Sequence, residues 1–256
     1  MISPFVASSP SAGSKGWMLV MPLAMVLQAV RISEMAVDRS MLDVFYTHMR
    51  AIVTCGPSYE PIDDVRRITN FSTGKLGVLL ANALTRAGHE VTCFKGLGAM
   101  TRESIETASV IPYSTNDDLR ARLAAVEARE KVGAFFHAAA LADFKVKREP
   151  GGARKLCSRT GEITLTLVPA AKVIGELRAL FPNARIVGWK YELDGTRDDV
   201  LAKAARQLAE NGTDVCVVNG AAYGAGFGVC EPGRPVLHLP DKPALCEWLS
   251  ARASGA

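Results

Sequence analysis

From residue 49 onward, short apolar runs alternate with longer segments of helical spacing, and this alternation limits the possible folds more than any other feature. Runs rich in β-branched and aromatic residues predict strands, whereas apolar residues repeated every three or four positions predict helices. The predicted strands cover 50–55, 90–94, 110–113, 132–141, 162–168, 185–191, 214–218 and 235–239, and the predicted helices cover 74–87, 117–131, 170–180, 198–210 and 242–253.

This order of elements predicts an α/β fold with a doubly wound, mostly parallel, Rossmann-like sheet, because helices that separate strands return the chain in one direction. Local signals place the helix ends. Gly88 and the pair Asn211-Gly212 follow predicted helices, Asn116 or Asp117 is a candidate cap, and Thr196 caps the next helix.

The middle of the chain departs from this pattern. Residues 145–159 are polar, basic and glycine-rich, which predicts a mobile loop, and the alternation over 162–168 predicts a strand with one solvated face. Together they predict a β arm that protrudes from the sheet. Because an exposed strand edge is usually covered, we expect a homodimer in which two arms pair.

Composition narrows the class of protein. The chain has 256 residues, 48% of them hydrophobic, which suits one α/β domain and excludes global disorder. A net charge of +4 is too small to indicate nucleic acid as a partner, although a local cationic pocket would suit an anionic small molecule. The six cysteines lack CxxC spacing and only four histidines are present, so we expect no zinc site and a reduced, cytoplasmic protein without a membrane partner.

Residues 1–48 do not continue the alternation. Their apolar run over 17–30 contains a proline and is shorter than the roughly 20 residues that span a bilayer. Three interpretations stay open: a disordered extension or misassigned start, with initiation at Met41 or Met49; a short helix packed on the domain; and an export signal. We assign 49–256 to the folded domain.

Small and polar residues follow the predicted strands, at the edge where doubly wound sheets bind ligands. Ser72-Thr73-Gly74 opens a predicted helix, whose free backbone N–H groups and positive dipole end favour an anion. The run matches neither GxxxxGK[ST] nor GxGxxG, so alone it fits a phosphate or nucleotide site and a plainly capped helix equally. Similar runs are Gly56-Pro57-Ser58, Ala138-Ala139-Ala140 and Asn219-Gly220.

Four blocks of sequence resemble one enzyme family. GPSYEPIDDVRRITNFSTGKLG is similar to the signature of the phosphopantothenoylcysteine synthetase family, a domain also named the DNA/pantothenate metabolism flavoprotein C-terminal domain. AAALADF resembles the family's AAxxDF/Y block, DVCVVNG its strand ending in asparagine, and KLCSRTGEITLTLVP its basic arm. The blocks stand in the family's order, and the resemblance covers residues 49–254.

The resemblance implies a ligase of coenzyme A biosynthesis. In that family CTP or ATP activates the carboxylate of 4′-phosphopantothenate as an acyl-nucleotide, and the amine of cysteine then displaces the nucleotide to form an amide. Since two anions must be held together, backbone N–H groups, basic side chains and Mg²⁺ are expected around them. We expect no flavin, because the leading residues cannot replace the flavin domain that is usually fused to this one.

The resemblance also assigns residues to the nucleotide. A glycine-rich cradle, an aromatic residue beside the base and an asparagine at the base or ribose are implied. A large buried residue and a strand-end turn are the structural alternatives for the last two. These positions are Gly56, Ser72, Gly74, Gly77, Trp189 and Asn219.

Three residues are implied to be catalytic. Asn70 matches the asparagine at the reacting carboxylate, and its alternative is a cap for the helix at Gly74. Lys155 matches the mobile-loop lysine that neutralises phosphates, and its alternative is a solvated lysine. Asp143 matches the pantothenate-binding turn, where it would bind metal or substrate hydroxyls or simply cap the loop.

Three more residues are implied to bind the substrate. Ala139 and Ala140 belong to the same turn as Asp143. Arg66 matches an arginine that reaches the substrate phosphate in the neighbouring subunit, and its alternative is a surface ion pair.

The sequence departs from the family pattern at several positions. Pro57 replaces a glycine and removes an N–H donor, and Cys157-Ser158 replaces a pair of lysines. Gln207 and Asn211 stand where lysines read a cytosine ring, so ATP competes with CTP as the nucleotide. Two other functions therefore stay open: a homologue that binds nucleotide or acyl-phosphate ligands without ligating, and a Rossmann-type NAD(P) oxidoreductase.

Overall fold

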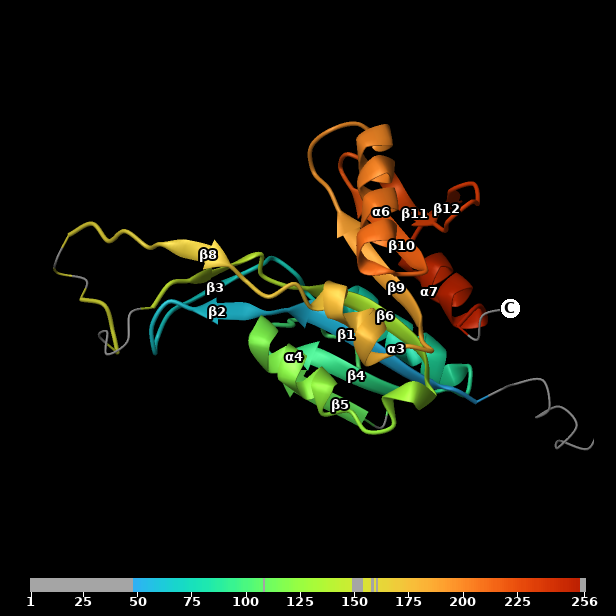
Figure 1. Ribbon diagram of the computed structural model, residues 1–256, viewed down its shortest axis with the longest axis horizontal. Helices are drawn as coiled ribbons and strands as arrows, with labels where there is room; N and C mark the ends of the chain where they lie inside the picture. Colours follow the sequence, from blue (N-terminus) through green and yellow to red (C-terminus); the bar gives the residue numbers. More distant parts are fainter. Residues whose placement is uncertain (1–47, 108, 149–153, 158, 160, 254–256) are drawn as a thin grey trace, which may run out of the picture. The chain divides into compact units, whose positions relative to one another are not determined.

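The computed structural model describes residues 48–107, 109–148, 154–157, 159 and 161–253, so the predicted N-terminal extension lies outside the described residues. An eight-stranded sheet has the order β12-β11-β10-β9-β6-β1-β4-β5 (Figure 1). Its strands are β1 (Arg50–Pro57), β4 (Glu90–Gly96), β5 (Ser109–Tyr113), β6 (Val132–Ala140), β9 (Arg185–Tyr191), β10 (Val215–Gly220), β11 (Gly224–Cys230) and β12 (Leu237–Leu239).

The strands from β5 to β10 in this order pair in parallel, and β11 pairs antiparallel with both β10 and β12 at one edge. This confirms the mostly parallel, doubly wound fold. The central strand β1 is buried almost throughout, as a strand covered by helices on both faces must be. The strand order reverses between β1 and β6, because β1 is followed by β4 and β5 on one side while β6, β9 and β10 continue on the other.

Two layers of helix cover the sheet. One face packs against α3 (Lys75–Arg86) and α7 (Lys242–Ala251). The other packs against α4 (Asn116–Ala124), the 3₁₀ turn η3 (Val173–Glu176), α5 (Leu177–Leu180) and α6 (Arg197–Asn211). None of the helices in the described ranges is long and apolar enough to cross a membrane.

Capping accounts for several helix boundaries. Thr196 forms the predicted cap of α6 and shares a reciprocal capping box with Asp199, and Gly212 ends the helix in the left-handed region at φ 58°. The predicted cap of α4 was wrong by one residue, because the side chain of Thr115 accepts from the backbone N–H of Asp118. That helix also ends early, at Ala124, and a separate 3₁₀ turn η1 (Arg129–Lys131) precedes β6.

The arm differs from the sequence prediction. It consists of two small antiparallel pairs, β2 (Tyr59–Pro61) with β3 (Arg67–Thr69), and β7 (Phe144–Val146) with β8 (Leu167–Pro169). In Figure 1, β2, β3 and β8 extend away from the main sheet. The strand predicted over 162–168 was therefore mostly wrong, because residues 162–164 are exposed on both faces and 162–166 have no ladder partner.

Candidate functional site

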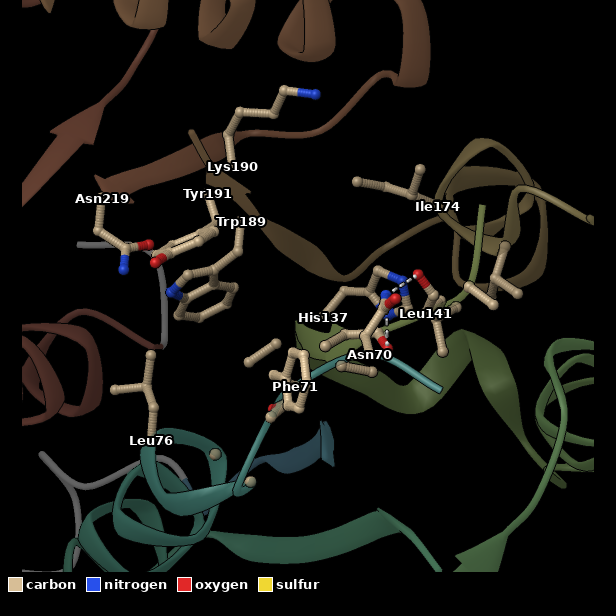
Figure 2. Close-up of a pocket in the computed structure, with 18 of the residues that line it drawn as sticks. Asn70, Phe71, Leu76, His137, Leu141, Ile174, Trp189, Lys190, Tyr191 and Asn219 are labelled. Carbon is tan, nitrogen blue, oxygen red and sulfur yellow. Dashed lines mark hydrogen bonds between the residues drawn. The ribbon is translucent and has the colours of Figure 1, made fainter. Parts of the chain in front are cut away.

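A cavity of about 780 Å³ opens at the carboxyl ends of the central strands, where the strand order reverses. The loop before α3, the turn after β6 and the ends of β9 and β10 line it (Figure 2). This is the position at which open α/β sheets bind ligands. The predicted site residues that line it are Asn70, Ser72, Gly74, Gly77, Ala139, Ala140, Asp143, Trp189 and Asn219.

The start of α3 suits an anion. Gly74 is the N-cap residue in the left-handed region at φ 74°, and it provides no side-chain cap. The hydroxyl of Thr73 accepts a hydrogen bond of 3.3 Å from the N–H of Lys75. The remaining first-turn N–H groups and the positive end of the helix dipole face the cavity region that Ser72 to Gly77 line.

Two glycines allow this loop to lie close to the sheet. A Cβ on Gly74 would lie 3.2 Å from the Cα of Gly56, and a Cβ on Gly77 would lie only 2.2 Å from the Cβ of Cys55. Gly56 itself is absent from the cavity lining. It supports the loop from behind, while Gly77 also sets the close packing of α3 on β1.

Asn70 links the two loops that form the cavity mouth. Its Nδ2 donates to the carbonyl of Leu141 at 2.9 Å and approaches that of Ala140 at 3.5 Å (Figure 2). These contacts assign the amide orientation, because only nitrogen can donate to two carbonyls. The structure thus excludes the alternative of a helix cap for this residue, and its Oδ1 stays available to a ligand.

The turn after β6 is held against the end of β1. The hydroxyl of Ser58 accepts from the N–H of Ala142 at 2.8 Å, and the N–H of Ser58 donates to the carbonyl of Ala140 at 3.3 Å. Asp143 follows this turn and forms an ion pair with Lys172. Its carboxylate is exposed and makes no loop cap, so ligand can reach both members of the pair.

The ends of β9 and β10 form the opposite wall. Trp189 and Tyr191 from β9 and Asn219 from β10 are drawn on one side of the cavity in Figure 2. The indole Nε1 of Trp189 is buried without a hydrogen-bond partner among the described residues. A partly buried aromatic ring with an unused donor fits a contact with a flat polar ring.

Sequence reasoning missed several residues of the lining. The ring of Phe71 is fully exposed beside Asn70, and His137 lies near the carboxyl end of β6. His137 is 7% exposed, and burial lowers its pKa to about 4, so its imidazole is neutral at physiological pH. Its position directly before the run Ala138-Ala139-Ala140 was the only available signal.

The arm holds two of the three predicted residues that do not line the cavity, and the third is Gly56. Arg66 is engaged within the arm: its Nε donates to the buried carboxylate of Asp63 at 2.9 Å and its Nη2 donates to the carbonyl of Leu156 at 2.8 Å. The guanidinium, together with backbone N–H donors, holds the pKa of Asp63 well below its usual range. Lys155 is exposed beside this cluster.

Within the described ranges no three His, Cys, Asp or Glu side chains converge on a metal site. Among the lining residues in the described part of the chain, Asp143 is the only carboxylate. This donor set does not fit a metal held by protein alone. It does fit Mg²⁺ that enters with nucleotide phosphates and takes one carboxylate from the protein, a usual arrangement for this ion.

A doubly wound domain with a glycine-lined helix start at its strand-order reversal belongs to the broad class of Rossmann-like α/β domains. More specifically, the family model described as "DNA/pantothenate metabolism flavoprotein C-terminal domain" matches residues 46–237, and the chain belongs to this family. The resemblance read from the four sequence blocks is thereby confirmed.

Individual relatives agree with this assignment. The chain is 34% identical over 70% of its length to a cysteine/cysteine sulfinic acid decarboxylase from an unknown prokaryotic organism, and 30% identical over 66% to the coenzyme A biosynthesis bifunctional protein CoaBC of Thermococcus kodakarensis. It spans 48% and 41% of these two relatives, respectively.

Two solved structures share the fold. The DNA/pantothenate metabolism flavoprotein from Streptococcus pneumoniae matches 80% of this chain and 97% of its own, with 23% identity and a TM-score of 0.69. A Cab2 mutant in complex with phosphopantothenate-cysteine matches 90% of this chain and 92% of its own, with 16% identity and a TM-score of 0.60.

Proposed function

We propose that this chain is a phosphopantothenate–cysteine ligase that joins 4′-phosphopantothenate and cysteine through an acyl-nucleotide. The observation that carries the proposal is the contact between Asn70 and the carbonyl of Leu141. It joins the family's longest signature block to its AAALADF block at the mouth of one cavity. The names of the CoaBC relatives support the same pathway.

Different parts of the cavity would bind different parts of the two substrates. The start of α3 would receive nucleotide phosphates, and the wall with Trp189 and Asn219 would contact the base and ribose. The turn at Ala139 and Ala140 would bind the pantothenate, with its carboxyl group toward Asn70. A carboxylate is a poor electrophile, so linking it to a nucleotide supplies a good leaving group, and Mg²⁺ would neutralise phosphate charge.

The nucleotide is proposed to be either ATP or CTP. Gln207 lines the cavity, whereas Asn211 does not and donates its side-chain amide to the carbonyl of Gln207 at 3.0 Å. A neutral amide at 207 can pair with either base. Pyrophosphate release with phosphopantothenate, cysteine and each nucleotide in turn tests both the activity and this choice, and flavin is not expected to contribute.

We further propose that the active assembly is a homodimer, because Arg66 and Lys155 lie outside the cavity of their own chain. Mixing an Arg66→Ala variant with an Asn70→Asp variant should restore activity if the arm of one subunit serves the cavity of the other. Light scattering that shows a monomer at micromolar concentration, with no restoration, would refute the dimer.

A cytoplasmic location is proposed because the five buried cysteines are free thiols, as is typical of reducing compartments.

A second candidate is a homologue that binds these ligands without ligating them. Pro57 favours it, because a proline at the end of β1 cannot donate an N–H to a phosphate. The two functions differ in outcome: ligand binding without pyrophosphate release for either nucleotide would select the second.

A further inference from the structure

His137 and Thr54 form a polar pair on the two central strands of the sheet, near their carboxyl ends. They are register partners on the adjacent parallel strands β6 and β1, so their side chains share one face. Thr54 is fully buried, and its Oγ1 lies 2.8 Å from Nδ1 of His137. No other side-chain hydrogen bond is made by either residue in the described part of the chain.

The pair sets the tautomer of the imidazole. Burial keeps His137 neutral, so its ring carries one N–H hydrogen. If that hydrogen were on Nδ1, the hydroxyl hydrogen of fully buried Thr54 would have no acceptor, at a cost of about 1–3 kcal/mol. The hydroxyl therefore donates to Nδ1, and the ring hydrogen is on Nε2.

The Nε2–H faces the cavity. His137 lines the cavity, and its Nε2 is not one of the buried polar atoms that lack a partner. Its register neighbour on β9 is Gly188, and the side chains of Gln207 and Ile174 pack over that glycine, where a Cβ would lie 2.6 Å from Nε2 of Gln207. That Nε2 donates to Sγ of Cys216. The N–H of His137 is thus an uncommitted neutral donor in the wall.

The donors of Asn70 are in the opposite situation. Its Nδ2 is directed at the carbonyls of Ala140 and Leu141, so it presents an acceptor to a ligand. Three of the four described lysines in the lining are also paired, namely Lys172 with Asp143, Lys75 with Glu103 at 2.7 Å and Lys190 with Glu192 at 3.3 Å. A reacting carbonyl oxygen needs a donor that is not already used.

We propose that His137, oriented by Thr54, is a catalytic residue whose Nε2–H donates a hydrogen bond to the carboxyl oxygen of the acid substrate, and the proposal rests on the ligase function above. When the amine attacks, its lone pair forms the C–N bond and the carbonyl oxygen gains negative charge. The C–O bond to phosphate then breaks and the nucleoside monophosphate leaves with the electron pair. The amine proton passes to solvent, and His137 keeps its own proton throughout.

The test compares four variants with the unaltered protein. His137→Leu removes the donor and should slow amide formation about 100-fold, the usual effect of losing one preorganised donor. His137→Gln keeps a neutral donor and should retain most of that rate. Thr54→Val removes the hydroxyl that fixes the tautomer of His137 and should lower the rate of amide formation. Thr54→Ser keeps a hydroxyl and should retain that rate. The matched control Thr107→Val removes another buried hydroxyl, which donates to the carbonyl of Val91, and should leave the rate per folded molecule unchanged.

A spectroscopic measurement separates this proposal from the ligase function. Nitrogen-15 NMR of the imidazole should show hydrogen on Nε2 in the unaltered protein and a mixture of tautomers in Thr54→Val. Hydrogen on Nδ1, or equal rates for His137→Leu and the unaltered protein, would overturn the role of His137. Absence of pyrophosphate release by the unaltered protein would instead overturn the ligase function, and the NMR result would be unaffected.

Discussion

The cavity at the carboxyl ends of the strands, called the crevice from here on, and the arm hold their functional residues in place by different means. In the crevice, loops end on buried parallel strands, and glycine contacts and backbone hydrogen bonds fix them, so most predicted site residues meet within one chain. In the arm, three-residue strands pair in twos, and Arg66 and Lys155 stay outside the cavity. The comparison teaches that one copy of the chain brings most of the predicted site residues together in the crevice. The arm, in contrast, is proposed to act only after a second copy or a substrate brings it there.

The largest difference between the two regions is expected in the free energy of unfolding, when the packing of α3 on β1 beneath the crevice is disturbed. Gly77→Ala should destabilise the protein by about 3 kcal/mol or more, because its Cβ would lie 2.2 Å from that of Cys55. In the arm, Gly161→Ala meets no atom within 4 Å and costs only the left-handed strain at φ 86°, about 1 kcal/mol. Urea unfolding measures both. Equal losses of unfolding free energy in the two variants would show that the two regions are packed equally tightly.

Acidification should loosen the crevice before the arm. The unfolded chain protonates His137 near pH 6.5 and the folded protein near pH 4, so stability is lost as the pH falls through this window, by roughly 3 kcal/mol in total. His137→Gln should remove this part of the pH dependence when unfolding is followed from pH 7 to pH 4. Identical curves for the variant and the unaltered protein would contradict the buried neutral imidazole.

Substitutions in the two regions should affect different half-reactions. Lys155→Gln in the arm should slow acyl-nucleotide formation, and Asn70→Asp in the crevice should slow amide formation, each by about 100-fold. The new carboxylate would oppose negative charge on the reacting carbonyl. Quenched-flow analysis without and then with cysteine follows the intermediate, which Asn70→Asp should accumulate.

Asn183→Asp is the matched control, because Asn183 also donates its side-chain amide to a backbone carbonyl, that of Glu130, outside the crevice. It should leave both half-reactions unchanged. If Asn70→Asp and Lys155→Gln lose activation equally, Asn70 only positions the loops.

The smallest effect is expected at the arm cluster. Asp63 accepts from the backbone N–H groups of Val65, Arg66 and Leu156, and Asp63→Asn removes the charge that holds them. Because the pKa of Asp63 is depressed, its contribution is present above the ordinary pKa of a carboxyl group and is lost only in stronger acid. Hydrogen exchange of the three amides should accelerate while the melting temperature stays nearly constant. A large fall in melting temperature would mean that the arm stabilises the sheet.

Sequence alone predicted the framework well, for a physical reason. Strand 185–191 has the observed bounds, and Thr196 and Gly212 mark the ends of α6 as predicted, because local capping and burial decide these elements. The strand β11 was missed because Gly224, Gly226 and Gly228 hide its pattern. The glycines there have specific uses: a Cβ on Gly228 would lie 2.7 Å from the ring of Tyr223.

The site was predictable only where it follows from strand order. Residues at the ends of sheet strands, such as Ala140 in β6 and Asn219 in β10, converge because parallel strands share one edge. The donor role of His137 depends on its register with Thr54 across two strands far apart in sequence, which spacing cannot reveal. The ion pair of Arg66 depends on the burial of Asp63 within the arm, which is likewise a property of the tertiary structure.

The start of α3, which has no side-chain cap, has a consequence for the stability of the domain when a phosphate is bound. Gly74 provides no side-chain cap for this helix, so the first-turn N–H groups other than that of Lys75, which donates to the hydroxyl of Thr73, are available to a ligand. A phosphate seated there would do the work that a serine or aspartate does in other helices. The nucleotide would then be a structural part of the domain as well as a reactant, and each turnover would remove and replace one of its helix caps.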